Sequence, residues 1–100
     1  MQYCVYILTN KRKTVLYTGM TSNLVKRIDE HKSKKNEGSF SKRYNLCHLV
    51  YYEELSSQNE ALERERMIKK KSRRGKEILI AHQNPNWNDL HPHGVLNSPV

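Results

Sequence analysis

The first apolar residues of the chain fall in two runs separated by a polar segment, a pattern that predicts a β-hairpin. Residues 2–9 and 14–18 are rich in aromatic and β-branched side chains, and the polar run 10–13 between them is typical of a turn. If the middle of that run forms the tip, Tyr6 lies opposite Tyr17 on one face of the hairpin. The second strand is expected to end at Gly19.

The next apolar positions recur at helical spacing. Residues 21–23, Thr-Ser-Asn, form a helix start signal, and the helix is expected to extend to about residue 34. Arg27 and His31 are four residues apart and therefore share one face of this helix, at the edge of its apolar stripe. The expected inward stripe consists of Leu24, Val25 and Ile28.

The second half predicts one strand and two helices. After a loop at 36–41, residues 46–53 form a third strand, and the capping box at 57–60 opens a long helix that ends near Gly75. Glu65 falls inside this helix's apolar stripe, where a carboxylate is costly unless its charge is compensated. A metal ion or a neighbouring cation such as Lys69 would compensate the charge of Glu65. The expected stripe is Ala61, Leu62 and Ile68.

The remaining residues predict a short third helix and a tail. The apolar run 78–81 forms that helix, and Asn84 with Pro85 ends it. Trp87 is expected to pack back on the body, and the last dozen residues, including His91 and His93, are expected to be tail-like.

Charge then narrows the choice of partner. The 100 residues carry 18 Lys and Arg against 10 Asp and Glu, a net charge of +8. Such a field attracts polyanions, so nucleic acid is the predicted partner and a solvated basic surface is the alternative. The candidate backbone contacts are Lys42, Arg43, Lys69, Lys70, Arg73, Arg74 and Lys76.

Other classes of protein are disfavoured by what the sequence lacks. No apolar window is long enough to cross a membrane, and the N-terminus is unlike a signal peptide. The two cysteines, Cys4 and Cys47, make no disulfide framework and, with His48, lack zinc-site spacing. We therefore expect a cytoplasmic protein.

The candidate chemistry is phosphodiester hydrolysis. An arginine can neutralise charge that builds on a phosphate, a base can take a proton from water, and a metal can polarise the phosphate. The residue types present are two facing tyrosines, Arg27 with His31, and Glu65. A single carboxylate suits one Mg²⁺ or Mn²⁺ that keeps most of its waters. Each of these residues also has a purely structural alternative, such as a pair between Arg27 and Glu30.

Five short motifs in order resemble the GIY-YIG nuclease family, and in particular its small standalone bacterial members. They are Cys4-Val5-Tyr6, Tyr17-Thr18-Gly19, Leu24 with Arg27 and His31, the helix Ala61 to Glu65, and Asn84-Pro85-Asn86-Trp87. The sequence departs from the pattern at Cys4, where the family has glycine, and at Met20, where some members have lysine.

The resemblance implies an α+β fold, with a three-stranded antiparallel sheet flanked by helices. It implies a nuclease-like domain over residues 2–83, followed by a C-terminal extension over 84–100. It assigns a general base to Tyr6 or Tyr17, phosphate contact to Arg27, assistance to His31 and one Mg²⁺ or Mn²⁺ to Glu65. Gly19 and Asn84 take supporting positions.

The expected function is therefore metal-dependent DNA cleavage, in repair or recombination. The alternatives are a binding module of the same fold without turnover, and a nuclease that depends on a targeting protein partner.

Overall fold

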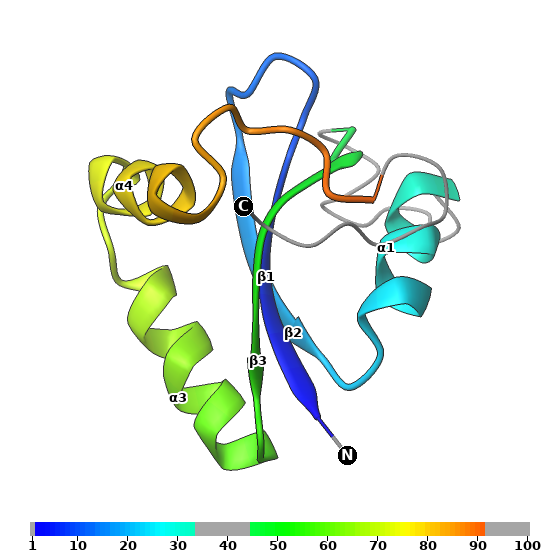
Figure 1. Cartoon of the computed structure of the whole chain (residues 1–100), viewed down its shortest axis with the longest axis vertical. Helices are drawn as coiled ribbons and strands as arrows, with labels where there is room; N and C mark the ends of the chain where they lie inside the picture. The colour runs from blue at the N-terminus through cyan, green and yellow to red at the C-terminus, as the bar shows by residue number, and fades with distance from the viewer. Residues whose placement is uncertain (1, 34–44, 92–100) are drawn as a thin grey trace.

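The computed structural model describes residues 2–33 and 45–91, and all of their side chains except those of 31–33. Three antiparallel strands, in the order β2-β1-β3, form one sheet. Helix α1 lies on one face of the sheet, and α3 and α4 lie on the other (Figure 1). The predicted α+β class is confirmed. The strands are β1 Tyr3–Thr9, β2 Leu16–Thr21 and β3 His48–Leu55; the helices are α1 Leu24–Ser33, α3 Gln58–Lys69 and α4 Arg73–Gln83.

The hairpin exists, but its predicted register was wrong. Tyr6 lies opposite Gly19, and Tyr17 lies opposite Leu8, so the pairing is displaced by two residues and β2 continues past Gly19 to Thr21. The cause is a longer loop. The Asn10 side chain accepts hydrogen bonds from the Thr14 and Val15 backbone, which removes residues 10–15 from the ladder. A two-residue shift preserves the face, so Tyr6 and Tyr17 remain on the same side.

Two hydrophobic clusters stabilise the two faces of the sheet. On the α3 and α4 side, residues of β1 and β3 pack with Ala61, Ile68 and Ile80. On the α1 side, Tyr6 and Leu8 pack with Leu24 and Ile28. Because residues alternate between faces along a strand, neighbours on β1 belong to different clusters.

Both apolar stripes are narrower than predicted. Val25 is 41% exposed and Leu62 is 42% exposed, so neither side chain belongs to the core. In the described side chains, α1 and α3 each contact the sheet through two buried residues, Leu24 and Ile28 in α1 and Ala61 and Ile68 in α3.

The two predicted helices of the second half exist, with different boundaries. The first ends at Lys69, before the expected end near Gly75, and the second begins at Arg73 after the N-cap Ser72, whose side chain accepts from the Gly75 backbone N–H. A serine that can cap inside the basic run explains why the break lies there. The predicted loop at 36–41 lies outside the described residues, as do Lys42 and Arg43.

Residues 84–91 pack on the body of the protein. Leu90 is buried and its N–H donates to the Leu49 carbonyl, while the Asp89 carboxylate accepts from the Leu49 N–H. His91 is fully buried, with its Nδ1 3.8 Å from the Asp29 carboxylate of α1. The placement of His91 in a tail was therefore wrong. Trp87 packs against the α3-side core, as predicted. The domain division at residue 83 stays a prediction.

Within the described residues, no helix combines the length and the apolar character that a membrane crossing requires.

Candidate active site

Two tyrosines of the hairpin meet over a glycine. The rings of Tyr6 and Tyr17 have centroids 6.4 Å apart and planes tilted by 47°. A Cβ at Gly19 would lie 2.6 Å from the Tyr6 hydroxyl oxygen and 3.2 Å from Tyr17 Cε2. Both rings therefore occupy the space that a side chain at position 19 would need. The sequence predicted a supporting role for Gly19, and the structure suggests what that role is: the absence of a side chain lets the two rings pack against the strand.

The Tyr6 hydroxyl lies where charges from both sides of the sheet can act on it. Burial is the main reason that the pKa of Tyr6 is raised far above its usual value, and the neighbouring Tyr17 raises it further. The Arg27 guanidinium opposes this rise in the pKa, whereas the carboxylates of Glu65 and Glu30 add to it. Arg27 belongs to α1 and Glu65 to α3, on opposite faces. The structure therefore brings Tyr6, Tyr17, Arg27 and Glu65 within electrostatic range of one hydroxyl group.

Arg27 borders an open pocket. A pocket of about 360 Å³ lies between the end of β2 and α1, and Arg27 shares its wall with Lys26 and Glu30. The Arg27 Nε is 3.9 Å from the Glu30 carboxylate, with both side chains partly exposed, so this pair is loose. The structural alternative for Arg27 is thus present, but it leaves the guanidinium accessible to an anion.

Glu65 is the carboxylate of α3 that lies toward the sheet. Its side chain is 18% exposed, compared with 68% for Glu63 on the same helix. One of its oxygens lies 3.3 Å from Lys69 Nζ, one turn later. This ion pair was the predicted alternative to a metal. Because Lys69 is largely exposed and flexible, it can move away without disturbing the core.

Glu65 can hold a divalent cation only with help from other ligands. Among the side chains that the structure describes, no three of the types His, Cys, Asp and Glu gather as a metal site. A single part-buried carboxylate fits Mg²⁺ or Mn²⁺ that takes its other ligands from water and a substrate phosphate. The donor set fits one ion and gives no support to a second.

His31 lies in α1 one turn after Arg27, and its side chain lies outside the described residues. Its predicted role therefore stays a prediction.

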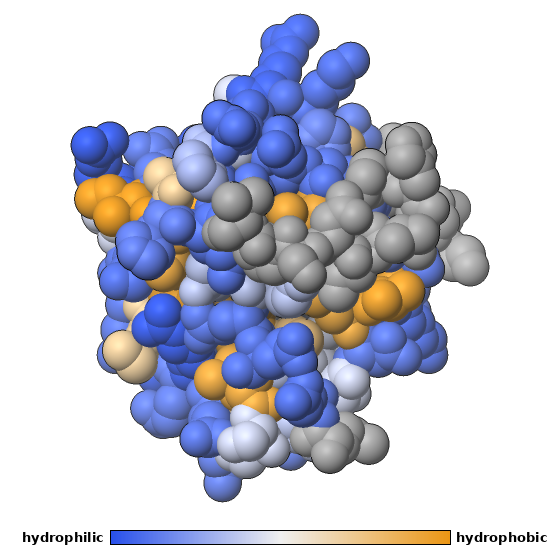
Figure 2. All heavy atoms as spheres, in the orientation of Figure 1, coloured by the Kyte–Doolittle hydropathy of each residue, from blue (hydrophilic) through white to orange (hydrophobic). Residues whose placement is uncertain are grey.

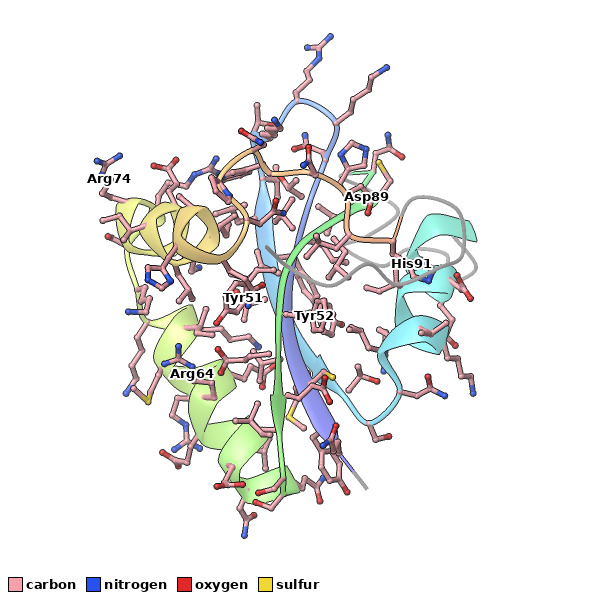
Figure 3. All side chains as sticks on the ribbon, viewed as in Figure 1. Tyr51, Tyr52, Arg64, Arg74, Asp89 and His91 are labelled. Carbon is pink, nitrogen blue, oxygen red and sulfur yellow. The ribbon has the colours of Figure 1, made fainter. Side chains whose placement is uncertain are left out.

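The basic candidates divide by what their side chains already contact. Arg74 is 81% exposed and projects from the start of α4 (Figure 3). Arg73 instead donates through Nη1 and Nη2 to the carbonyls of Thr14 and Lys13, and through Nε to Glu77. Lys69 pairs with Glu65, whereas Lys70 is exposed at the end of α3 and Lys76 is half-buried. Arg73 is therefore engaged within the protein.

Asn84 supports the fold at a distance from the tyrosines. It is 1% exposed, and its side-chain amide donates to the carbonyls of Val50 and Asn88 and accepts from the Asn88 N–H. These bonds fix the turn after α4 against β3.

Sequence reasoning did not include two residues of the pocket among the site candidates. Lys26 and Glu30 flank Arg27 on the first turns of α1, where residues three or four apart share a face. The one available signal was their spacing from Arg27, which any surface charge on a helix would also show.

The two departures from the motif pattern are accommodated. The Met20 side chain packs against the α3-side core, whereas the tyrosine rings lie in the α1-side cluster. A lysine at position 20 of this strand would therefore begin on the face away from the tyrosines. Cys4 is a partly buried member of the α1-side cluster.

Comparison with known proteins identifies the class to which this fold and site belong. The model of the GIY-YIG catalytic domain matches residues 2–78, and the chain belongs to the GIY-YIG family. This is a family of nucleases that generally use a divalent metal, so nucleic acid is the indicated substrate class.

Within this family, the chain is similar to the UPF0213 proteins. A UPF0213 protein of Syntrophus aciditrophicus is 46% identical over 81 residues, which cover 81% of this chain and 91% of that one. A UPF0213 protein of Natronomonas pharaonis is 38% identical over 80 residues, covering 79% and 91%. The solution NMR structure of the UPF0213 protein BH0048 from Bacillus halodurans has a TM-score of 0.57 and 32% identity, over 93% of this chain and 98% of that one. These names state no activity, so the particular reaction has to be argued from the site.

Proposed function

We propose that this protein is an endonuclease that hydrolyses phosphodiester bonds of DNA with the help of one Mg²⁺ or Mn²⁺. The observation that carries the proposal is geometric: the Tyr6 and Tyr17 rings meet over Gly19 on the sheet face that α1 covers, and Arg27 of α1 borders an open pocket. A cation and a carboxylate beside two tyrosines are the groups that phosphodiester hydrolysis requires.

Arg27 would bind the scissile phosphate. Its guanidinium borders an open pocket and is held only loosely by Glu30. A planar fork of donors can engage two phosphate oxygens at once, and it stabilises the charge that grows on them during attack. His31, one turn further along the helix, would assist at the same phosphate.

Tyr17 is the tyrosine that we assign as general base. Tyr6 is 2% exposed, and its pKa is raised by burial, which disfavours the phenolate at neutral pH. Tyr17 is half-buried and therefore has more access to an attacking water. Tyr17 would release its own proton to solvent and then take the proton of the attacking water at its phenol oxygen, while its ring packs against Tyr6 with centroids 6.4 Å apart.

Glu65 would hold the metal ion. When bound, the ion supplies positive charge that polarises the phosphate and stabilises the leaving oxygen. The part-buried setting of Glu65 restricts the motion of its carboxylate more than the exposed setting of Glu63 does, which favours a fixed ligand position.

The basic residues outside the site would bind the DNA backbone. The structure describes four of them, Lys69, Lys70, Arg74 and Lys76, whereas Lys42 and Arg43 are predicted from the sequence alone. We place this activity in the cytoplasm and in DNA repair or recombination, where strand breaks are made and processed. A targeting protein partner would supply any sequence preference.

The alternative of a binding module without turnover is favoured by one observation, the deep burial of Tyr6 with its raised pKa. It predicts salt-sensitive binding and no metal-dependent product.

A cleavage assay separates the two functions. Labelled duplex, single-stranded, branched and RNA substrates are incubated with the protein in Mg²⁺, in Mn²⁺ and in chelator, and Tyr17→Phe and Tyr6→Phe are tested beside the wild type. We expect metal-dependent DNA products, lost on the order of 100-fold or more in Tyr17→Phe and less in Tyr6→Phe. Bound but uncut nucleic acid under every condition would refute the nuclease.

A further inference from the structure

Arg73 ties together two basic segments that are about 60 residues apart in sequence. Its Nη1 donates to the Thr14 carbonyl at 3.0 Å, and its Nη2 donates to the Lys13 carbonyl at 2.7 Å. Its Nε donates to Glu77 at 3.0 Å, one turn along α4. All three nitrogens of the guanidinium are thus engaged inside the protein. Arg73 is therefore a positioning residue that joins the hairpin tip to the start of α4.

The hairpin tip is held in one conformation. The side-chain oxygen Oδ1 of Asn10 accepts hydrogen bonds from the backbone N–H groups of Thr14 at 2.8 Å and Val15 at 3.2 Å. The side-chain nitrogen Nδ2 of Asn10 donates to the Thr14 hydroxyl at 2.7 Å. Lys13 has a φ of 59°, in the left-handed region that non-glycine residues rarely adopt. Arg73 holds the carbonyl of this same strained residue. The contacts made by Asn10 and Arg73 offset the strain and fix the direction of the tip.

The fixed tip presents three exposed cations. Lys11, Arg12 and Lys13 are all exposed, and the hydrophilic side chains at the tip project from the top of the molecule in Figure 2. A basic loop that served solubility alone would need no tether and no strained residue. The contacts made by Arg73 therefore fix the position of these three charges relative to α4.

The first turn of α4 adds one further cation to this set. The half-buried Lys76 lies one turn after Arg73, on the face that Arg73 turns toward the hairpin. Arg74, which is 81% exposed and lies 3.9 Å from the Glu77 carboxylate, projects away from the tip in Figure 3. We name the set Lys11, Arg12, Lys13 and Lys76 the tip–α4 ridge.

We propose that the tip–α4 ridge binds the phosphate backbone of a nucleic-acid duplex at a second place, apart from the candidate active site. This inference rests on the proposed function and defines its substrate further. Phosphates are recognised by exposed lysine and arginine without regard to sequence. Two contact places at a fixed separation favour a duplex, because its backbone is rigid over that length while a single strand is not.

The separation of the two places sets a minimum length for the substrate. Lys11 lies five positions after Tyr6, along β1 and into the turn, which corresponds to at most about 17 Å at roughly 3.3 Å per residue. Phosphates along one strand of B-DNA are spaced about 3.4 Å apart along the axis. The ridge would therefore contact the duplex about five base pairs from the cleaved phosphate, and a shorter duplex would bind only at the active site.

The test compares two exposed arginines that differ in position. Arg12→Gln removes one charge from the ridge, and Arg66→Gln removes one charge from α3 outside it. Binding is measured by fluorescence anisotropy at several salt concentrations in chelator, with a duplex of about 20 base pairs and a hairpin whose stem of about four base pairs cannot reach the ridge. Single-turnover cleavage at saturating protein is measured for both variants.

We expect Arg12→Gln to weaken binding of the long duplex several-fold, and to lower the slope of log K against log salt by about one, the share of one phosphate contact. Arg66→Gln should change neither quantity. The short stem should bind all three proteins equally, and the cleavage rate at saturation should be unchanged.

Arg73→Lys tests the positioning role separately. It preserves the net charge but cannot donate to Lys13, Thr14 and Glu77 together. We expect it to lower the salt slope as Arg12→Gln does, while its circular dichroism spectrum and its saturating cleavage rate stay those of the wild type.

The ridge is refuted if Arg12→Gln and Arg66→Gln alter the salt slope equally, or if the short stem loses as much affinity as the long duplex. Either result leaves the nuclease proposal standing, because cleavage is measured independently. A slope that falls in Arg12→Gln without any metal-dependent cleavage by the wild type would support the ridge and overturn the proposed activity.

Discussion

At the residue scale, Gly19 is a position where the packing leaves no room for a side chain. The tyrosine rings lie in the volume that a side chain there would take. In Gly19→Ala, the new methyl group would meet the Tyr6 hydroxyl oxygen at 2.6 Å and displace the ring. We expect a loss of about 1–3 kcal/mol of stability and a fall in cleavage on the order of 100-fold. Thermal unfolding and single-turnover cleavage measure the two effects.

Gly75→Ala is the matched control. Gly75 lies in the first turn of α4, and a Cβ there would lie 3.2 Å from Lys71 Cβ and would meet no part of the site. An alanine in a helix is favoured over glycine by up to about 1 kcal/mol, which offsets this tight contact, so the variant should be as active as the wild type and close to it in stability. If Gly19→Ala behaved like Gly75→Ala, the close packing of the tyrosines would have no role in catalysis.

A second cluster at the residue scale contributes to the stability of the fold in alkali. On the α3 side of β3, the Tyr51 hydroxyl donates to the Glu53 carboxylate, which also accepts from Arg64 Nε at 2.6 Å (Figure 3). Tyr51 is 4% exposed. Burial is the largest reason that the pKa of Tyr51 is raised to about 12, and the hydrogen bond to Glu53 adds to it.

The sign of this effect predicts a pH dependence. Below pH 10 the phenol is protonated in both states, so its contribution to stability is at full strength. Between pH 10 and about 12 the unfolded chain releases the proton while the folded chain retains it, so stability falls as the pH rises. Urea unfolding from pH 9 upward should show a shallower decline in Tyr51→Phe than in the wild type. Equal declines would show that Tyr51 does not contribute to alkaline unfolding.

At the scale of elements, the sequence predicts the strands and helices better than their pairing. Hydrophobic period and capping residues indicate each element, because both act over a few neighbouring residues. The register depended on the side chain of Asn10, which holds residues 10–15 in the loop, and no local pattern revealed this. The motif spacing still identified the residues around Tyr6, because a shift by two preserves the face.

Contacts between residues far apart in the chain could not be predicted from the sequence, for a related reason. The burial of His91 depends on the return of residues 84–91 to β3 and α1, and the engagement of Arg73 depends on a hairpin 59 residues earlier. Both His91 and Arg73 are polar residues in polar segments, so the local sequence predicts that their side chains are exposed. Their environments are set by tertiary packing, which local periodicity does not encode.

Asn84 makes the connection between two elements, and its removal should affect stability rather than chemistry. Asn84→Ala would leave the buried Val50 carbonyl and the Asn88 N–H without their side-chain partner. We expect a loss of about 1–3 kcal/mol. Thermal unfolding should detect this loss, while the cleavage rate well below the transition stays normal.

Asn86→Ala provides the comparison for this prediction. Asn86 is an exposed residue of the same turn, so its substitution should change neither quantity. A loss of cleavage in Asn84→Ala at a temperature where it is fully folded would place Asn84 in the chemistry and contradict its structural role.

At the scale of the whole molecule, the sheet separates the two helices that carry the proposed site residues. Arg27 lies on α1 and Glu65 on α3, which cover opposite faces of the sheet. Under the proposed function, folding is therefore a condition for assembling the site. The net charge of +8 would bring nucleic acid to it, and the tip–α4 ridge would orient a duplex along it.

The central claim is that Glu65 provides the carboxylate for metal-dependent cleavage. Single-turnover cleavage of a labelled duplex in Mg²⁺, with protein in excess, compares the wild type with Glu65→Gln and Glu63→Gln. The two glutamates share a helix, but their exposed fractions are 18% and 68%. We predict that Glu65→Gln loses on the order of 1000-fold in rate while it still binds the duplex, and that Glu63→Gln cleaves like the wild type. Cleavage by Glu65→Gln at the wild-type rate would contradict this account.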